Sequence, residues 1–145
     1  MKTKMITCIA FLTITLSGLA QELTKDMYLA IKNDNTSALK SQLQDNALNN
    51  CYTIKETAYG LLALSAKAGA IECFDMLLNT EGIDVTVNCT GKTPLLYAAK
   101  YGHLEMVKKL VAAGADTSYS NKGKTALDYA KKYEHEDVIN YLMEH

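Results

Sequence analysis

Apolar residues recur at helical spacing in pairs of short segments along this chain. After Gly102, the residues Val107, Leu110 and Val111 form one apolar stripe, as expected of a helix with a single buried face. Before Gly102, another segment begins at Pro94, whose fixed φ and missing N–H suit the first turn of a helix. We therefore predict two short antiparallel helices joined at Gly102, because a positive φ is favoured after the first helix.

The same arrangement returns along the chain at a nearly constant interval. Much of the pattern of residues 91–116 recurs 32 positions later in residues 123–142, and 33 positions upstream Gly69 falls on Gly102. Two short helices cannot bury an apolar face alone, so the repetition predicts units that stack on one another.

An earlier helix-turn-helix pattern covers Met27 to Leu43, with Asp34 in the turn. We expect it to form the first unit of the stack. Its expected apolar set is Leu29, Ile31, Leu39 and Leu43.

The most regular unit, residues 91–116, reads GKTPLLYAAKYGHLEMVKKLVAAGAD. It resembles the ankyrin repeat, with Leu96 in place of the histidine in the family's Thr-Pro-Leu-His motif. The resemblance covers nearly all of residues 26–145, and it is strong over 87–130 and weak before residue 57. A helical repeat fold is what this resemblance implies.

In full, the resemblance implies an all-α ankyrin-repeat solenoid of about four helix-turn-helix units with connecting hairpin-like loops. The second unit departs from the family pattern in its loop, where Tyr59–Gly60 stands in place of Thr-Pro. The expected parts of the repeat domain, residues 21–145, are an N-terminal cap unit 24–50, repeats 51–86 and 87–119, and a C-terminal cap unit 120–145.

The first twenty residues have the composition of a cleaved secretory signal. Lys2 and Lys4 make the start basic, residues 5–16 are an apolar run, and residues 17–20 end in small residues at the two positions that a signal peptidase reads. We therefore expect residues 1–20 to be removed and the rest to be exported to a periplasm or beyond the cell. The alternative is an N-terminal core helix. After this segment, no stretch has the roughly 18 apolar residues needed to span a bilayer.

Export changes how the cysteines are interpreted. Removal of residues 1–20 takes away Cys8 and leaves three cysteines, Cys51, Cys73 and Cys89, in an oxidising compartment. Cys51 and Cys89 each follow an asparagine at the start of a loop, and loops of adjacent ankyrin repeats project side by side, so the resemblance suggests a disulfide between them. Cys73 lies between Ile71 and Leu77 in an expected second helix, and we interpret it as a small core residue. An odd cysteine also leaves room for an intermolecular bridge.

The charge composition disfavours nucleic acid as a partner. All 15 basic residues are lysine, and removing Lys2 and Lys4 leaves 13 lysines against 16 acidic residues, a net charge of −3. Arginine supplies the bidentate contacts to phosphate and guanine that are common in nucleic-acid recognition, and this chain has none.

Motifs for catalysis and metal binding are missing from the sequence. No two cysteines or histidines stand at ligand spacing, and there is no Gly-rich phosphate loop, Gly-x-Ser-x-Gly or His-Glu-x-x-His motif. His103 and His135 match the histidine that follows the family's turn glycine, which implies a structural hydrogen bond. We expect no enzyme activity, no cofactor and no metal, and a shallow surface without an enclosed polar pocket.

The resemblance places partner contacts at loop tips and at exposed positions of the first helices, on the concave side. Lysines and tyrosines collect there, whereas acidic residues such as Glu72 and Glu105 fall on second helices. Tyr97 and Tyr129 are expected to pack between first helices, where Leu64 and Leu29 stand in earlier units. The expected partner-binding residues are Lys67, Lys92, Lys100, Tyr101, Lys122, Lys124, Lys132 and Tyr133.

These observations predict a monomeric, exported protein–protein interaction module whose partner is an acidic protein. Specific roles within that class are an inhibitor or immunity-type protein, and a secreted factor acting on host proteins. The alternative is a structural or stress-protective envelope protein without a single dedicated partner, in which exposed lysines only keep the chain soluble.

Overall fold

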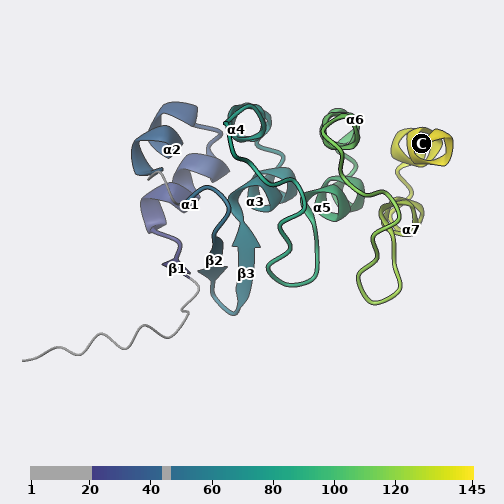
Figure 1. The fold of residues 1–145 in the computed structure, drawn as a ribbon, viewed down its shortest axis with the longest axis horizontal. Coiled ribbons are helices and arrows are strands. Elements are labelled where there is room, and N and C mark those ends of the chain that lie inside the picture. Colours follow the sequence, from purple (N-terminus) through teal and green to yellow (C-terminus); the bar gives the residue numbers. More distant parts are fainter. Residues whose placement is uncertain (1–20, 44–46) are drawn as a thin grey trace, which may run out of the picture.

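The computed structural model describes residues 21–43 and 47–145, and within them helices form antiparallel pairs (Figure 1). The predicted signal segment, residues 1–20, lies outside the described residues. The pairs are α1 (Lys25–Lys32) with α2 (Thr36–Gln42), α3 (Leu61–Ala68) with α4 (Ile71–Leu78), α5 (Pro94–Tyr101) with α6 (Leu104–Ala112), and α7 (Ala126–Lys132) with α8 (Glu136–Glu144).

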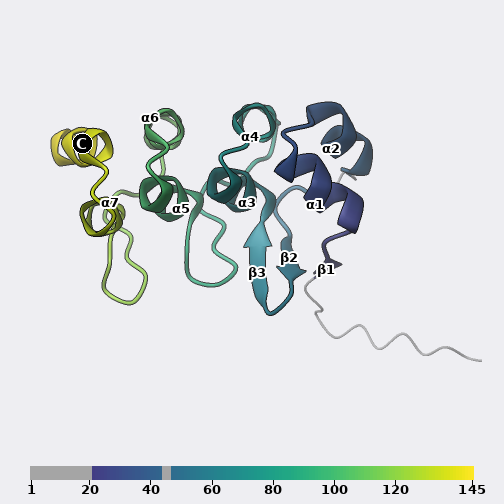
Figure 2. The ribbon, with the colours of Figure 1, turned by 180° about the vertical axis from the view of Figure 1, so that it is seen from behind.

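First and second helices lie in two rows. Figures 1 and 2 show α1, α3, α5 and α7 in one row, the second helices in the other, and the connecting loops projecting beyond the first row. Helix α3 packs on α5 and α5 on α7 more extensively than α1 packs on α3. The first helices are therefore closely spaced everywhere except at the N-terminal end.

Helix starts and ends follow the local signals in the sequence. The side-chain oxygens of Thr24, Thr93 and Thr125 accept hydrogen bonds from backbone N–H groups in the first turns of α1, α5 and α7. After α5, Gly102 takes a φ of 73°, and a Cβ there would lie 2.6 Å from Nδ1 of His135. Glycine is therefore required at this turn by both conformation and space.

The all-α expectation is wrong at the loop of the second unit. Strand β2 (Cys51–Ile54) pairs antiparallel with β3 (Thr57–Gly60), and β1 (Gln21–Glu22) pairs parallel with β2, giving the sheet order β1-β2-β3. The hairpin is rich in β-branched and aromatic residues, which favour strands. Its Tyr52 is buried and donates a hydrogen bond to the Ala47 carbonyl oxygen at 2.8 Å.

Small side chains on the first helices set the spacing of the units. Ala66, Ala98, Ala99 and Ala130 are fully buried, so neighbouring first helices approach closely. On the second helices, the buried apolar side chains include Phe74, Leu77, Met106, Val107, Leu110, Val138 and Leu142.

The apolar set of the first unit is only partly as predicted. Ile31 and Leu39 are buried, Leu43 is half-buried, and Leu29 is 37% exposed. Helix α1 begins at Lys25, so its inward face carries Met27, Ala30 and Ile31 at helical spacing. Counted from the N-cap residues Thr24 and Thr93, the counterpart of Tyr97 is Tyr28 rather than Leu29.

The turn of the first unit caps a helix of the second. Asp34 has a φ of 52°, and its two carboxylate oxygens accept hydrogen bonds from the backbone N–H groups of Cys73 (2.8 Å) and Glu72 (3.1 Å). The residue at the N-cap of α4 is Ala70, which has no side-chain oxygen to offer. Asp34 of the first unit therefore accepts the hydrogen bonds of two unpaired N–H groups at the start of α4. Its negative charge is also favourable at a helix N-terminus.

Replacing Asp34 with glycine should lower the free energy of unfolding by about 1–3 kcal/mol, because two backbone donors lose a charged acceptor. Glycine keeps the positive φ accessible, so the change isolates the capping contact. Urea denaturation checks it. Glu134→Gly is the matched control, since Glu134 also has a positive φ, 59°. Equal losses in the two variants would show that the Asp34 carboxylate contributes nothing.

The cysteines are arranged as the sequence suggested. Cys51 and Cys89 form a disulfide with a Cα–Cα distance of 5.5 Å, which ties the start of β2 to the loop before α5. Cys73 is fully buried as a free thiol. Burial, reinforced by the neighbouring Asp34, raises the pKa of this thiol to about 12, so it stays protonated and unreactive at neutral pH.

Because the disulfide closes a sequence separation of 38 residues, its loss should destabilise the fold by about 2–4 kcal/mol. We expect reductant to lower the urea midpoint of the wild type to that of the Cys51→Ser/Cys89→Ser variant. The midpoint of the variant itself should not respond to reductant. A wild-type midpoint that is insensitive to reductant would contradict the assigned bond.

Candidate functional site

Lysines and tyrosines line up along the first helices. Lys67, Lys100 and Lys132 occupy the same position in α3, α5 and α7, so stacking of the units brings them into one row. We call the following set the lysine–tyrosine strip: Tyr59, Lys67, Lys92, Tyr97, Lys100, Tyr101, Lys132 and Tyr133.

Cation–π contacts connect the members of this strip. The Lys100 ammonium lies 5.1 Å from the ring centroid of Tyr101 and 5.5 Å from that of Tyr133, so it bridges two units. Lys132 lies 5.4 Å from the Tyr133 ring. At the other end, the Lys67 ammonium lies 4.3 Å from the centre of the Tyr59 ring. These contacts hold flexible lysines in place while their charge stays accessible.

The tyrosines divide into an inner and an outer set. Tyr97 and Tyr129 are buried, at 5% and 8% exposure, and Tyr97 lies 5.7 Å from Tyr59 between ring centroids. Burial raises the pKa of Tyr97 to about 12, so its hydroxyl stays neutral. The packing role predicted for the inner tyrosines is confirmed, and Tyr101 and Tyr133, at 39% and 42% exposure, remain available as outer rings.

The structure places the predicted residues in two groups. Lys67, Lys100, Tyr101, Lys132 and Tyr133 are brought together in the strip, and Lys92 joins them with its ammonium 6.0 Å from the Tyr97 ring centroid.

The other group consists of Lys122 and Lys124, which lie exposed in the loop between α6 and α7. A backbone bridge between Asn121 and Lys124 closes that loop.

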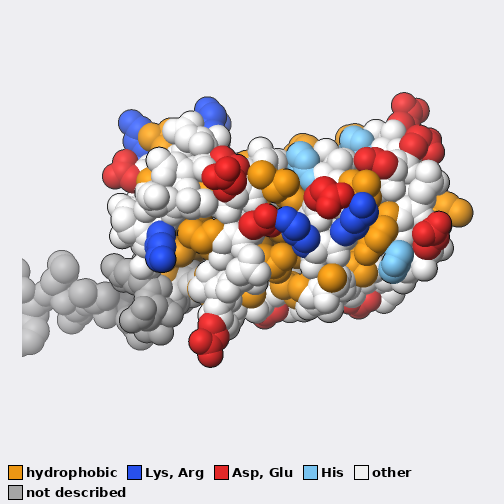
Figure 3. All heavy atoms as spheres, turned by 90° about the horizontal axis from the view of Figure 1, so that it is seen from above, with side chains coloured by type: hydrophobic (Ala, Val, Ile, Leu, Met, Phe, Trp, Pro, Cys, Tyr) orange, Lys and Arg blue, Asp and Glu red, His pale blue; other side chains and the backbone are white. Residues whose placement is uncertain are grey.

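The face formed by the second helices carries charge of both signs (Figure 3). Asp75 forms a close ion pair with Lys109 at 2.6 Å, and Glu105 pairs with Lys108 at 3.0 Å. The expected acidic residues do lie on this face, but lysines from α6 neutralise part of their charge. Among the first helices, by contrast, α3 and α5 carry lysine and no acidic residue, whereas α1 carries Asp26 and α7 carries Asp128.

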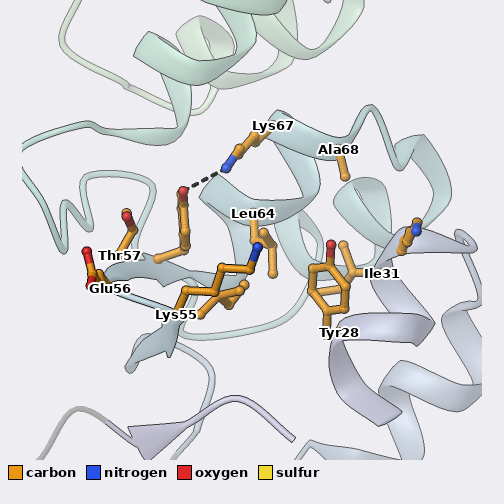
Figure 4. Close-up of a pocket in the computed structure, with 11 residues that line it drawn as sticks. Tyr28, Ile31, Lys55, Glu56, Thr57, Leu64, Lys67 and Ala68 are labelled. Atoms are coloured by element: carbon orange, nitrogen blue, oxygen red, sulfur yellow. Dashed lines mark hydrogen bonds between the residues drawn. The ribbon is translucent and has the colours of Figure 1, made fainter. Parts of the chain in front are cut away.

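A cavity that the sequence reasoning missed opens beside the strip. It measures about 710 Å³ and lies between α1, the β2–β3 hairpin and α3 (Figure 4). The sequence predicts a shallow surface without an enclosed polar pocket, and that expectation did not include this open recess with its apolar base. The signal for it was present in the second unit, where Leu64 and Ala68 stand at positions occupied by tyrosine in later units.

The histidines that follow the turns of the third and fourth units, His103 and His135, each contact the preceding unit. Nε2 of His135 is 3.0 Å from the carbonyl oxygen of Lys100, which fastens the C-terminal unit to the helix that carries a strip lysine. His103 packs against the turn at Gly69. Burial lowers the pKa of His103 below its ordinary value, and the charge of the neighbouring His135 acts in the same direction.

Neither a metal-binding cluster nor a membrane-spanning helix occurs in residues 21–43 and 47–145. In this part of the chain, histidine, cysteine and acidic side chains form no cluster suited to a metal ion. None of the helices described there has the length and apolar character needed to cross a membrane.

Comparison with known proteins agrees with the geometry of stacked helix pairs. A family model described as "Ankyrin repeats (3 copies)" matches residues 27–121 and 62–145. The chain belongs to the ankyrin-repeat family. Ankyrin repeats are generic protein–protein interaction modules and typically non-catalytic, which makes a protein the expected kind of partner.

This chain spans only 2–3% of the length of the curated relatives that it matches. Human "Ankyrin repeat and KH domain-containing protein 1" is 41% identical over 61 residues, covering 42% of this chain and 2% of the relative. "Cortactin-binding protein 2" of Aotus nancymaae is 41% identical over 56 residues, covering 38% of this chain and 3% of the relative. The match spans so little of each relative that it supports the repeat and not their whole activities.

The lowered pKa of His103 predicts a pH-dependent stability of this ankyrin domain. The folded state binds this proton less readily than the unfolded state, whose histidine pKa is about 6.5. The free energy of unfolding should therefore be fully maintained above that pH and fall as the pH drops below it. Urea denaturation at pH 7.5 and pH 5.5 measures the change.

His103→Gln should remove this part of the pH dependence, whereas His145→Gln, at an exposed terminal position, should keep it. Identical pH profiles for the wild type and His103→Gln would refute the assignment.

Proposed function

We propose that this ankyrin-repeat chain is an exported binding module that holds an acidic protein against its lysine–tyrosine strip and loop tips. In this proposal the units form a continuous solenoid and the strip lies on its concave side. The observation that carries the proposal is the row Lys67, Lys100 and Lys132, in which each ammonium lies near a tyrosine ring and none forms an ion pair with a carboxylate of the described residues.

The composition of the strip suits a protein interface. Exposed tyrosines combine apolar contact area with a hydroxyl, and aromatic residues are enriched at the cores of interfaces. A row of lysines attracts a negatively charged surface and orients its approach. Because the chain as a whole carries a net charge of −1, this local excess of positive charge is a feature of one face rather than of the overall composition.

Export is supported by the disulfide and by the N-terminal segment. A bond between Cys51 and Cys89 persists in oxidising compartments such as a periplasm or the extracellular space. Residues 1–20 carry the sequence pattern of a cleaved signal. We infer that the protein acts as a monomer there, in a role such as an inhibitor or immunity-type protein that covers an acidic surface of its target.

The proposal is tested by affinity capture with the protein expressed from its full-length gene and tagged at the C-terminus. Envelope and secreted fractions of the source are passed over it without reductant, and bound proteins are identified by mass spectrometry. We expect one stoichiometric acidic partner. The mass of the N-terminus of the tagged protein reports at the same time whether residues 1–20 were removed.

Reversing the charge at two strip positions, Lys100→Glu and Lys132→Glu, should weaken this partner's affinity by at least about tenfold, because like charges would face each other across the interface. The control reverses Lys40 and Lys131, which alter the net charge equally but make none of the ring contacts. Equal affinity of the two variants would refute steering by the strip. A repeated blank would favour the alternative, an envelope protein without a dedicated partner.

A further inference from the structure

The cavity beside the strip has three walls from different parts of the chain (Figure 4). Helix α1 contributes Tyr28 and Ile31, the hairpin contributes its tip, and α3 contributes Leu64 and Ala68. Its volume of about 710 Å³ falls within the range of about 300–1,000 Å³ that is typical of ligand pockets. A cavity of this size beside a candidate interface is large enough to bind a side chain of a partner protein.

The cavity exists because the second unit has smaller side chains than the units that follow. Counted from the N-cap residues, Leu64 occupies the position of Tyr97, and Ala68 occupies that of Tyr101 and Tyr133. The gap between the second and third units is closed by the neighbouring rings of Tyr59 and Tyr97. In the gap between the first and second units, the smaller side chains leave the space open.

The hairpin wall is fixed before any ligand arrives. The disulfide holds the first residue of β2, and Thr90 of the following loop donates a hydrogen bond to the Ala58 carbonyl oxygen of β3 at 3.3 Å. Buried Tyr52 ties the hairpin to the segment after α2. A wall held at three points lowers the entropic cost of binding, because little of it has to be ordered on contact.

The floor of the cavity is apolar and its rim is basic. Ile31 and Leu64 are buried, at 1% and 4% exposure, and form an apolar base. Lys32, Lys55 and Lys67 line the opening against a single acidic residue, Glu56. Figure 4 shows Lys55 extending toward Leu64 and Tyr28, whereas the Glu56 carboxylate points away from them.

The rim lysines are not engaged in ion pairs with carboxylates of the described residues, where the pairs found involve Lys108 and Lys109. Lys67 donates one hydrogen bond to the Tyr59 hydroxyl at 2.6 Å, and an ammonium has three donors. An apolar base under a basic rim is complementary to an apolar group that has a carboxylate next to it.

We infer that this cavity receives one large apolar side chain, phenylalanine or leucine, from a segment of the acidic protein partner, with a flanking aspartate or glutamate on the rim lysines. The inference rests on the proposed function. To that function it adds one apolar side chain of the partner, which is inserted in the cavity as an anchor. Tyr59 and Lys67 belong both to the cavity and to the strip, so one partner surface can cover the two without a break. Apolar anchors that fill pockets dominate the binding energy of many interfaces.

Ala68→Tyr is the sharpest variant for the test. It places in the second unit the tyrosine that the third and fourth units carry at the same position, and Ala68 is exposed, so the fold should accept it. The new ring should fill the cavity while the strip lysines stay in place. Ala68→Ser is the matched control, because it changes the same residue and leaves the space open.

The probes are two peptides, acetyl-Asp-Glu-Phe-Asp-amide and its Ala-for-Phe counterpart, each titrated to 2 mM, a concentration on the order of the Kd expected for so small a ligand. Amide NMR signals of the isotope-labelled full-chain product report where they bind. We expect the Phe peptide to shift the amide signals of four cavity residues, Ile31, Thr57, Leu64 and Ala68. The Ala peptide should shift these signals at least about fivefold less at equal concentration. Ala68→Tyr should abolish these shifts, and Ala68→Ser should retain them.

If the Phe peptide shifts the amide signals of Lys100 and Tyr133 but not those of the cavity residues, the inference of an anchor in the cavity is wrong. The proposed function would not be contradicted by that result. Absence of any shift with the Phe peptide would also overturn the anchor, whereas the proposed function is decided separately by capture and the Lys100/Lys132 reversal. Equal binding of the Phe peptide to Ala68→Tyr and the wild type would overturn the inference as well, because a filled cavity cannot hold a second ring.

Discussion

Close packing of the first helices through alanine is the constraint on which the rest of this structure depends. Ala66, Ala98, Ala99 and Ala130 are fully buried, and their small side chains allow α3, α5 and α7 to lie next to one another. Any larger side chain at these positions would force the helices apart. Because α3, α5 and α7 pack side by side in the same way, residues at the same position of each helix lie in one row. Lys67, Lys100 and Lys132 therefore share one surface.

The strip and the cavity are two results of the same stacking. Where tyrosines stand at the inner and outer positions of a first helix, as at Tyr97 and Tyr101 of the third unit, the inner ring is buried between units and the outer ring lies under the Lys100 ammonium. Where smaller residues stand at the same positions, as at Leu64 and Ala68, the gap stays open and becomes a recess. The surface chemistry of this chain therefore varies unit by unit while its backbone plan is maintained.

Contacts between units do more than bury apolar surface. Asp34 supplies the helix cap that α4 lacks, and His135 is hydrogen-bonded to the end of α5. The Cys51–Cys89 disulfide joins neighbouring loops at their bases. Each of these contacts links one unit to the next, so the stability of a unit depends on its neighbours, as expected of a repeat architecture.

The sequence by itself determined the helix pairs and the turn at Gly102, because these depend on short-range signals repeated at a constant interval. The resemblance to the ankyrin repeat added the pairing of Cys51 with Cys89 and the inner position of Tyr97, since both depend on how neighbouring units stack. Only the tertiary structure decided the β2–β3 hairpin, the inward face of α1 and the cavity. Strand pairing and the rotation of a short helix depend on what packs against them, and an empty volume is defined by side chains from three separate segments. No local pattern in one segment contains that information.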